Sequence, residues 1–161
     1  MLTIIKNYEC LIDEDDEYII NKYKWGISNK KGTIYIQVTI KVDGEKRTIQ
    51  LAREILNAPS DKLVDHINGN TLDNRKSNLR LADKRTNAHN MRRNINTTSK
   101  YKGVCWDKFR NKWRSTIKVE DKQRHLGRFE TELEAAKAYD EAASKYFGEF
   151  ARLNLGEFYD I

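Results

Sequence analysis

The sequence has little cysteine, proline and glycine, and it has no long hydrophobic run. Its 161 residues include two cysteines, one proline and eight glycines. Cys10 and Cys105 alone cannot form a disulfide framework or a four-cysteine zinc site, which favours a reducing, cytoplasmic setting. No apolar stretch approaches the ~20 residues of a transmembrane helix. The N-terminus lacks the basic and apolar regions of a signal peptide, so we expect no secretion.

Several common catalytic signatures are also absent from the sequence. It contains no P-loop, no nucleophile elbow and no dinucleotide-binding glycine pattern. The content of hydrophobic residues (39%) and aromatic residues (10%) is typical of a folded chain. The length predicts one or two small domains.

Positive charge is concentrated in the middle of the chain. The formal net charge is +6, but residues 1–60 hold nine basic and nine acidic side chains. From Arg75 to Lys118, fourteen basic residues stand against two acidic ones, Asp83 and Asp107. Such a block suits a polyanion, although a merely solvated surface remains an alternative.

The N-terminal part reads as short strands and helices separated by polar turns. Residues 33–42 alternate apolar and polar side chains and predict a strand, and Asp43-Gly44 predicts a hairpin turn. The acidic run at 13–17 is interpreted as a helix start, with a metal site as the alternative. Further predicted elements are a returning strand at 47–51, helices at 16–24, 53–57 and 83–93, and strands at 63–66 and 79–82 around a polar loop at 67–78.

After residue 93 the pattern changes. Residues 94–100 form a basic polar linker, and the low hydrophobicity of 94–99 makes this segment the best domain boundary. Three strands at 101–106, 112–119 and 123–129 precede a helix at 132–147, and Thr131 and Glu134 form its capping box. We therefore predict an α+β protein with domains at 1–93 (a β-rich lead-in at 1–60 and a core at 61–93) and 101–155.

The densest chemistry lies between Asp65 and Asn87. A strand, loop, strand and helix in this order would bring Asn87 back against the strand that carries Asp65 and His66. One carboxylate and one amide oxygen would then converge on a hard cation such as Mg²⁺. His66, neutral near pH 7, could take a proton from water.

The segment DHINGNTLDNRKSNLR at 65–80, continued to Asn90, resembles the HNH nucleases, which have a ββα-metal fold. The resemblance implies that Asp65 and Asn87 bind one Mg²⁺ or Mn²⁺ and that His66 is the general base. It also implies that Asn78, and less directly Asn74, hold the segment that bears His66. By the same resemblance Arg80 lies near a phosphate, and the products are 5′-phosphate and 3′-hydroxyl ends.

One position departs from this resemblance. Relatives often have His-Arg about fourteen residues before the catalytic histidine, and this sequence has Ala52-Arg53 there. The change either weakens activity or removes a structural contact. His89 is interpreted as an exposed or phosphate-facing residue, with a metal ligand as the alternative.

The strand from residue 112 has two different faces. Trp113, Ser115, Ile117 and Val119 would pack under the alanine-rich helix, whereas Arg114, Thr116 and Lys118 would form a flat basic surface. The next strand would add Gln123 and His125 to that surface. A β-sheet of this kind can enter the major groove of DNA.

The C-terminal part resembles the AP2/ERF DNA-binding domain. The resemblance rests on Tyr101-Lys102-Gly103-Val104, Lys112-Trp113, Leu126-Gly127-x-Phe129, Glu134-Ala135-Ala136-x-Ala138-Tyr139-Asp140 and Gly148-x-x-Ala151-x-Leu153-Asn154. It implies a three-stranded antiparallel sheet that lies on DNA. The residues implied to face the duplex are Lys102, Arg110, Arg114, Thr116, Lys118, Gln123 and His125. Cys105 and Gln123 replace arginines of plant members, so their target sequence does not carry over; Trp106 could pack or contact DNA.

Together the two resemblances favour a metal-dependent DNA endonuclease of the homing type, from a phage or other mobile element, that acts on double-stranded DNA as a monomer in its host cell. Arg92 and Arg93, directly before the linker, would follow the DNA backbone. The alternatives are a decayed nuclease that acts as a DNA-binding regulator and an RNA-processing protein. Residues 1–60 carry no motif; they could complete the nuclease core, shape the substrate groove or mediate self-association.

Overall fold

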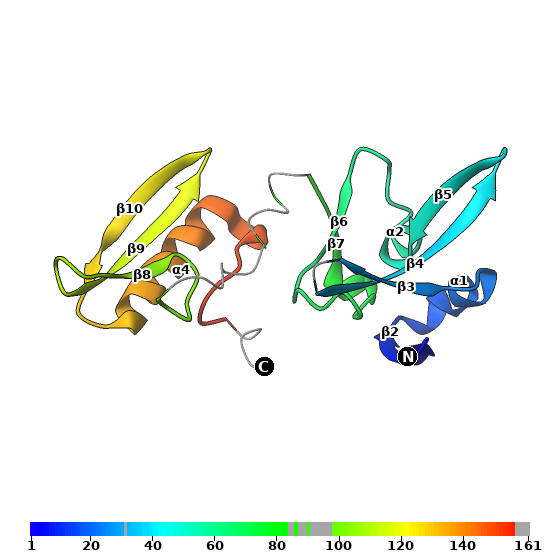
Figure 1. Ribbon diagram of the computed structural model, residues 1–161, viewed down its shortest axis with the longest axis horizontal. Helices are drawn as coiled ribbons and strands as arrows, with labels where there is room; N and C mark the ends of the chain where they lie inside the picture. Colours follow the sequence, from blue (N-terminus) through cyan, green and yellow to red (C-terminus); the bar gives the residue numbers. More distant parts are fainter. Residues whose placement is uncertain (31, 84–85, 87–89, 91–97, 157–161) are drawn as a thin grey trace. The chain divides into compact units, whose positions relative to one another are not determined.

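The structure is a computed structural model that describes residues 1–30, 32–83, 86, 90 and 98–156. The chain divides into two compact units, Met1–Asn87 and Ala88–Ile161 (Figure 1). Both units mix helices with antiparallel sheets, so the predicted α+β class is confirmed. Most of the predicted helix at 83–93 and of the predicted linker at 94–100 lies outside the described residues. No helix in the described ranges is long and apolar enough to cross a membrane.

The N-terminal unit contains three small antiparallel sheets, β1-β2, β3-β4-β5 and β6-β7. Strand β4 has the predicted bounds, and so do the two strands around the polar loop. Three further strands were not predicted, because each is only four or five residues long and shows little alternation. The elements are β1 (Leu2–Ile5), β2 (Tyr8–Leu11), η1 (Glu14–Asp16), α1 (Glu17–Lys22), β3 (Gly26–Lys30), β4 (Thr33–Val42), β5 (Glu45–Gln50), α2 (Leu51–Ile55), β6 (Leu63–His66), η2 (Lys76–Asn78) and β7 (Leu79–Ala82).

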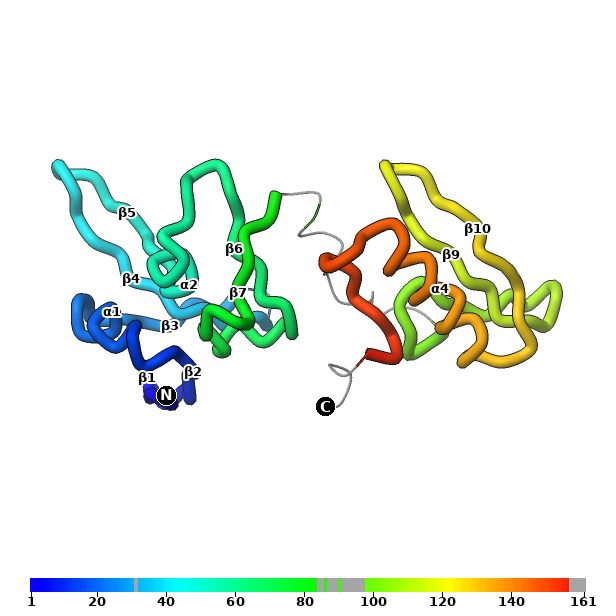
Figure 2. Tube along the Cα trace, turned by 180° about the vertical axis from the view of Figure 1, so that it is seen from behind, coloured from blue at the N-terminus to red at the C-terminus, as the bar shows by residue number. Residues whose placement is uncertain are grey.

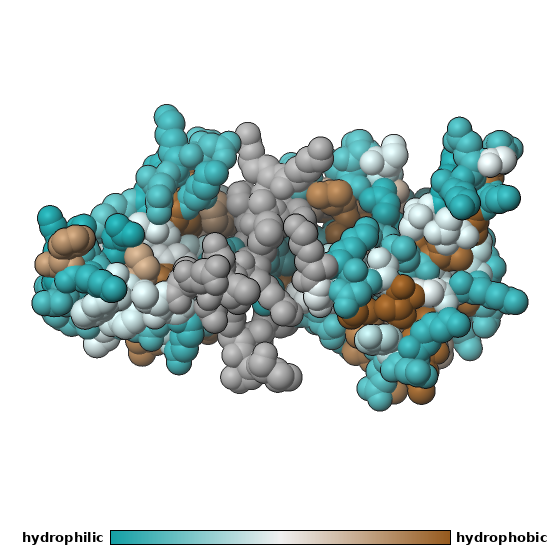
Figure 3. Space-filling model, viewed as in Figure 1, coloured by the Kyte–Doolittle hydropathy of each residue, from teal (hydrophilic) through white to brown (hydrophobic). Residues whose placement is uncertain are grey.

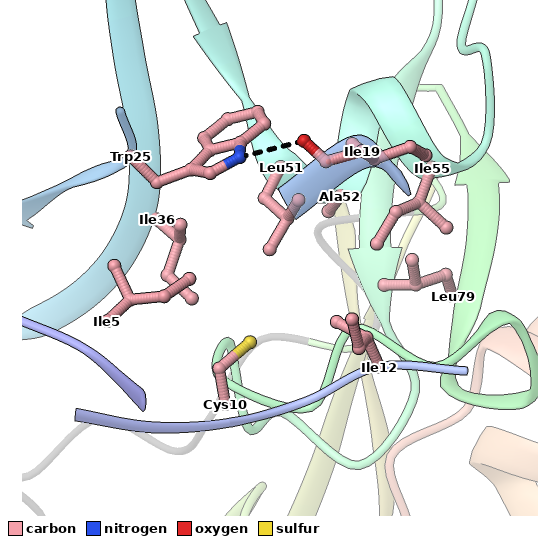
Figure 4. Packing of buried hydrophobic residues seen from close by; sticks show 10 residues of the cluster. All are labelled: Ile5, Cys10, Ile12, Ile19, Trp25, Ile36, Leu51, Ala52, Ile55 and Leu79. Carbon is pink, nitrogen blue, oxygen red and sulfur yellow. Dashed lines mark hydrogen bonds between the residues drawn. The ribbon is translucent and has the colours of Figure 1, made fainter. Parts of the chain in front are cut away.

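One apolar core holds these sheets together. Ile12, Leu51 and Cys10 are fully buried, and the indole Nε1 of Trp25 donates to the carbonyl oxygen of Ile19 at 3.1 Å (Figure 4). Leu79 of β7 belongs to the same cluster. The core therefore fixes the β6–β7 hairpin to the N-terminal strands, because each buried aliphatic side chain contributes roughly 1.5–3 kcal/mol.

The C-terminal unit is a three-stranded antiparallel sheet covered by one helix (Figure 2). Ala135, Ala136 and Ala143 are completely buried where helix α4 meets the sheet, and small side chains allow this close approach. The capping box of Thr131 and Glu134 is present as predicted. The elements are β8 (Val104–Asp107), β9 (Lys112–Val119), β10 (Lys122–Phe129), α4 (Glu132–Phe147) and η3 (Gly148–Phe150).

Strand β8 begins later than predicted because Gly103 interrupts the extended backbone. Gly103 has φ +77°, and a Cβ there would lie 2.2 Å from the Cδ2 of Tyr139 and 2.6 Å from the carbonyl oxygen of Thr116. Only glycine allows the chain to pass this close to helix α4. The backbone N–H of Thr116 donates to the carbonyl oxygen of Gly103 at 2.8 Å, which anchors the segment on β9.

Candidate active site and nucleic-acid interface

Asp65 and Arg80 form a buried ion pair across the β6–β7 hairpin. The register places the two residues opposite each other. Arg80 donates to one carboxylate oxygen, Asp65 Oδ2, from Nε at 2.9 Å and from Nη2 at 2.7 Å. Only 11% of the Arg80 side chain and 8% of the Asp65 side chain are exposed. Arg80, which we expected near a phosphate, thus contacts the carboxylate that we predicted to bind metal.

His66 lies at the end of β6 and contacts Asn74 of the following loop. Its Nε2 is 3.3 Å from Asn74 Oδ1. The Asn74 amide nitrogen faces the carbonyl oxygen of Thr71 and the sulfur of Cys10, each at 3.4 Å. Because the carbonyl of Thr71 can only accept, the oxygen of this amide must face the histidine. His66 then donates from Nε2, which leaves the lone pair of the neutral ring on Nδ1.

Burial keeps this imidazole neutral. His66 is 8% exposed, and desolvation lowers the pKa of its ring below the ordinary value of 6.5. The hydrogen bond to Asn74 and the negative charges of Asp65 and Asp73 act in the opposite direction and are weaker. A neutral ring at physiological pH has the protonation state that a general base requires.

Asparagine side chains shape the loop between β6 and β7. Asn78 Oδ1 accepts from the backbone N–H of Asn68 at 3.0 Å, and Asn78 Nδ2 donates to the carbonyl oxygen of Asp73 at 2.8 Å. The backbone N–H of Ile67, directly after the histidine, donates to the carbonyl oxygen of Asn78 at 2.9 Å. The guanidinium of Arg75 holds the pKa of Asp73 below its usual range. Hydrogen bonds and an ion pair therefore hold this loop in place.

The N-terminal hairpin and the acidic run hold this loop from the other side. The backbone N–H of Asn74 donates to the carbonyl oxygen of Leu11 at 2.7 Å. Asp13 accepts from the backbone N–H of Lys76, and Asp16 accepts from the ammonium of Lys76, both at 2.7 Å. The acidic run therefore binds a lysine of the loop. Its interpretation as a helix start is compatible with the short helices η1 and α1.

Cys10 completes this contact between the hairpin and the loop. Burial raises the pKa of its thiol to about 11, so Cys10 is a neutral side chain that packs against Asn74. No motif in the sequence linked Cys10 to the histidine, since 64 residues separate it from Asn74.

The chemistry of the donor set suits a hard divalent cation. Mg²⁺ commonly takes one or two carboxylate or carbonyl oxygens from protein and keeps several waters. Asp65 offers a carboxylate at the end of β6, and the second predicted ligand, Asn87, lies outside the described residues. Within the ranges that the structure describes, no group of three or more His, Cys, Asp or Glu residues could enclose a metal. A site built from one carboxylate and one amide does not require such a group.

Ala52 and Arg53, where the sequence departs from the resemblance to HNH nucleases, both contact the surrounding N-terminal unit. Ala52 is 6% exposed and belongs to the apolar core. The guanidinium of Arg53 donates to the carbonyl oxygens of Lys62 at 2.6 Å and Pro59 at 2.7 Å. Arg53 therefore fixes the segment that leads into β6.

The exposed side of the C-terminal sheet carries most of the residues that we expected to face DNA. The register pairs Lys118 with Gln123 and Thr116 with His125, so these four side chains share one face, as predicted. Ser115, Ile117 and Val119 are buried on the other face. We define the outer face as Cys105, Arg114, Thr116, Lys118, Gln123, His125 and Arg128.

Arg128 belongs to this outer face because of a β-bulge that strict alternation does not predict. The register of β9 and β10 shifts between His125 and Gly127, where Gly127 has φ +145°. Arg128 then lies opposite Arg114, and Phe129 turns towards the core. A glycine inside a strand pattern is the signal that could have revealed this bulge. Arg128 donates to Asp107 Oδ2 at 2.9 Å, which lowers the pKa of that carboxyl.

Several side chains of the outer face hold one another. Gln123 Nε2 donates to Thr116 Oγ1 at 3.2 Å, and Arg114 Nη2 donates to the sulfur of Cys105 at 3.3 Å. Lys118 pairs with Asp121 at 2.9 Å in full contact with solvent. These contacts are weak enough to open when a nucleic acid competes for the same groups.

Two further predicted residues lie near the edges of the sheet. Arg110 is exposed in the turn between β8 and β9. Lys102 is partly buried, and desolvation together with the nearby charge of Arg152 lowers its pKa to about 8. Its backbone N–H donates to Asn154 Oδ1 at 2.6 Å. Lys102 is still mostly protonated at pH 7, and a nearby phosphate would favour the charged form further.

The remaining predictions divide into packed and undescribed residues. Trp106 lies edge-on to Trp113, with ring centroids 5.1 Å apart, so one of its alternatives, packing, is observed. Asn87, His89, Arg92 and Arg93 lie outside the described residues.

Known proteins resemble the chain in both units. Residues 57–89 match the family described as HNH endonuclease, and residues 99–149 match the AP2 domain. Protein 3.8 of Escherichia phage T7 is 39% identical over 101 residues, which cover 62% of this chain and 83% of that protein. An uncharacterized HNH endonuclease of Acanthamoeba polyphaga mimivirus is 34% identical over 146 residues, covering 87% of this chain and 71% of that protein.

The likeness to plant proteins is confined to the C-terminal unit. An AP2-like ethylene-responsive transcription factor of Arabidopsis thaliana is 42% identical over 58 residues, which cover 36% of this chain and 18% of that protein. No solved structure matches the chain.

Proposed function

The chain belongs to the HNH endonucleases and carries an AP2 domain, and from this premise we propose that it is a divalent-metal-dependent DNA endonuclease of the homing type. It would hydrolyse phosphodiester bonds in double-stranded DNA to 5′-phosphate and 3′-hydroxyl ends. The observation that carries the proposal is the buried His66, whose ring contacts Asn74 and whose pKa is lowered by burial, directly after Asp65 on β6. The similarity of the chain to a phage protein supports an origin in a phage and action in the infected host cell.

His66 would act as the general base. Asn74 fixes the ring so that Nε2 is the donor, and Nδ1 takes the proton of the attacking water. Asp65 and Asn87 would hold Mg²⁺ or Mn²⁺. When bound, such an ion supplies Lewis-acid stabilisation of the charge that develops on the phosphate and the leaving oxygen. Asn78 would keep the histidine-bearing segment in place through its bonds to Asn68 and Asp73.

Arg80 would have two uses at this site. In the structure its guanidinium forms an ion pair with Asp65. This pairing offsets the desolvation cost of burying the carboxylate when no metal is bound. A guanidinium has five N–H donors, so Arg80 could contact a phosphate oxygen and keep one bond to Asp65. The exposed fractions of Asp65 and His66 are 7% and 8%, so both side chains are buried.

The outer face of the C-terminal sheet would supply binding. Lys102, Arg110 and Lys118 would meet phosphates, which set position, while Arg114, Thr116, Gln123 and His125 would supply the few contacts that set sequence. Arg92 and Arg93 would follow the DNA backbone between the units. This division predicts that cleavage and binding can be separated by mutation.

A plasmid-nicking assay with Mg²⁺ or Mn²⁺ tests the site. We expect His66→Ala and Asp65→Ala to reduce nicking about 10²–10⁴-fold, because each removes a group that acts in the reaction. Binding to a duplex in EDTA should stay unchanged. Lys22→Ala, which removes an exposed ion pair with Glu54, is the control and should cut normally. Full cutting by either site variant would refute the assignment.

The second candidate is a decayed nuclease that regulates by binding DNA. Ala52, where relatives often have histidine, favours it. Tight, salt-sensitive binding with no nicking in any divalent metal would support this candidate, and a preference for RNA over DNA would point to the third, an RNA-processing protein.

A further inference from the structure

One face of the β3-β4-β5 sheet is polar along its whole length. The register pairs Gln37 with Gln50, Thr39 with Thr48 and Lys41 with Lys46, so these side chains share a face. On the other side of β4, Ser28 lies opposite Tyr35 and Lys30 lies opposite Thr33, so these four side chains belong to the same face. We define the polar face as Ser28, Lys30, Thr33, Tyr35, Gln37, Thr39, Lys41, Lys46, Thr48 and Gln50.

The opposite face of the same sheet lies on the apolar core. Ile36 is buried in the core cluster, and Ile27, Val38 and Ile49 pack against it. The polar face therefore points away from the core. Thr39, Lys41, Lys46 and Thr48 are exposed on it.

Charge is segregated between this face and the rest of the unit. The polar face has three lysines, and none of its described residues is acidic. Glu45, the one carboxylate within these strands, pairs with Val42 and so lies on the opposite face. The acidic run at 13–17 lies elsewhere, where Asp13 and Asp16 bind Lys76. A segment that is neutral by sequence is thus folded into an acidic part and a basic surface.

The side chains of the polar face can exchange hydrogen bonds with a ligand. The hydroxyls of Thr39 and Thr48 lie 3.1 Å apart, and the ammonium of Lys30 lies 5.9 Å from the ring centroid of Tyr35. Gln37 Oε1 is buried and has no hydrogen-bond partner in the described part of the chain. Such an orphaned acceptor is costly, and a donor from a bound ligand would relieve the cost after the amide turns outwards.

The shape of the β4–β5 hairpin suits the major groove. The hairpin pairs six residues of each strand, Gln37–Val42 with Glu45–Gln50, and this paired part spans about 20 Å. The major groove, about 12 Å wide, admits a two-stranded antiparallel ribbon. Figures 1 and 2 both show β4 and β5 extending beyond the rest of their unit, and Figure 3 shows hydrophilic residues over the end of this hairpin.

The same strand is bonded to the candidate active site. The hydroxyl of Thr71, in the loop between β6 and β7, donates to the carbonyl oxygen of Ile34 on β4. A duplex held on the polar face would thus be held by the unit that carries Asp65 and His66. This continuity favours the substrate itself as the occupant.

We propose that the polar face of the β3-β4-β5 sheet is a second surface that binds double-stranded DNA, with the β4–β5 ribbon in the major groove. Lys30, Lys41 and Lys46 contact phosphates, and the glutamines and threonines between them contact base edges. The choice of DNA as the ligand rests on the proposed function. The surface itself rests on register, charge and burial.

Two neighbouring residues of β5 provide a matched test. Lys46 lies on the polar face, whereas Arg47 pairs with Ile40 and lies on the opposite face; both are exposed and positively charged. Binding of the full chain to a fluorescently labelled duplex is measured by anisotropy in EDTA over a range of salt concentrations. We expect Lys46→Glu to weaken binding about tenfold at low salt and to reduce the salt slope by about 1. Arg47→Glu should change the affinity less than about twofold. Equal losses in the two variants would overturn the proposal.

Cross-linking provides a second test that does not rely on an introduced negative charge. A photoreactive residue in place of Thr48 should cross-link to the duplex, and the same residue in place of Arg47 should not. Cross-linking from both positions, or from neither, contradicts the proposal. Tighter binding of duplex RNA than of duplex DNA, or a dimer that Lys46→Glu dissociates in sedimentation, would assign the face to another occupant and also overturn it.

The outcome can be separated from that of the proposed function. Because binding is measured without a metal, a catalytically inactive chain can still show the difference between Lys46→Glu and Arg47→Glu. Conversely, a chain that nicks plasmid normally but binds DNA equally well in both variants would reject the polar face and leave the nuclease site intact.

Discussion

The two units use different physical means to hold a functional surface in place. In the N-terminal unit, the loop around the candidate active site is fixed by buried polar groups: Asp65, His66, Asp73, Asn74 and Asn78 are all at most 8% exposed. In the C-terminal unit, the sheet is fixed from behind by close packing on the alanines of α4. Buried polar networks orient individual atoms, which catalysis needs, whereas close packing keeps a flat face rigid, which binding needs.

The two units also differ in the burial of their functional ionisable side chains. The buried histidine lies in the polar loop of the first unit, where desolvation lowers its pKa. The outer face of the second unit is exposed, and its contacts to Asp121 and among its own side chains lie at the surface. Three experiments can break or sharpen this contrast, in order of the expected effect.

The largest effect is expected from Gly103→Ala. The new methyl group would overlap the ring of Tyr139 and the carbonyl oxygen of Thr116, and the backbone would keep φ +77°. We expect a loss of about 4 kcal/mol in the free energy of unfolding of the C-terminal unit, from overpacking and a strained φ together. Urea denaturation of the full chain measures it. Gly148→Ala, with open space around the Cβ but with φ +53° and ψ −130°, a region that glycine alone adopts readily, is the control for backbone strain and should cost about 2 kcal/mol. Similar losses in both variants would argue against close packing as the support of this sheet.

A smaller effect is expected from Arg80→Ala in the N-terminal unit. The substitution leaves the buried Asp65 carboxylate without the guanidinium that binds its Oδ2, and we expect a loss of about 3 kcal/mol. Because Mg²⁺ could replace the lost charge, added Mg²⁺ should raise the melting temperature of this variant more than that of the natural chain. Lys22→Ala, which removes a mostly exposed pair, should barely change stability. An unchanged Arg80→Ala protein would show that polar burial is not what holds the loop.

The third effect concerns pH and is the smallest near neutrality, because the windows of the two units lie on either side of pH 7. His66 has a folded-state pKa below 6.5, so the unfolded chain binds the proton first, and the stability of the N-terminal unit should fall as pH drops below about 6.5. Lys102 has a folded-state pKa of about 8 against 10.5, so the C-terminal unit should gain stability as pH rises from 8 towards 10.5.

Denaturation curves followed by NMR signals of each unit would separate the two windows. His66→Gln should remove the acid-side dependence, and Lys102→Met should remove the alkaline one. A common pH dependence of both units, unaffected by these variants, would contradict the assignment of the two windows to these residues.

Regular patterns in the sequence predicted the regular elements closely. The alternation of 33–42 and the capping box of Thr131 and Glu134 gave a strand and a helix with the observed bounds, because both signals are local. Strands β1, β2 and β3 were missed because pairs of short strands are stabilised by their neighbours more than by their own residues. The turn of the first hairpin has Lys6 and Asn7 at positive φ, so no glycine in the sequence marked this turn.

The candidate site divides in the same way. The resemblance of the sequence to HNH nucleases indicated Asp65, His66, Asn78 and Arg80. It did not reveal that Arg80 binds Asp65, that Asn74 bridges His66 and Cys10, or that a bulge moves Arg128 to the outer face. These contacts depend on strand register and on residues far apart in the chain.

The sequence by itself determined the longer elements, such as β4 and α4, and the residue types available for chemistry, since these follow from local patterns. The two kinds of domain were indicated by the resemblance of its motifs to known families. Only the tertiary structure decided which charges meet. The nine acidic and nine basic side chains of residues 1–60 cancel in the sequence. Pairing of β3, β4 and β5 places three lysines on one face without a carboxylate, because side chains on paired strands are sorted by register and not by their order in the chain.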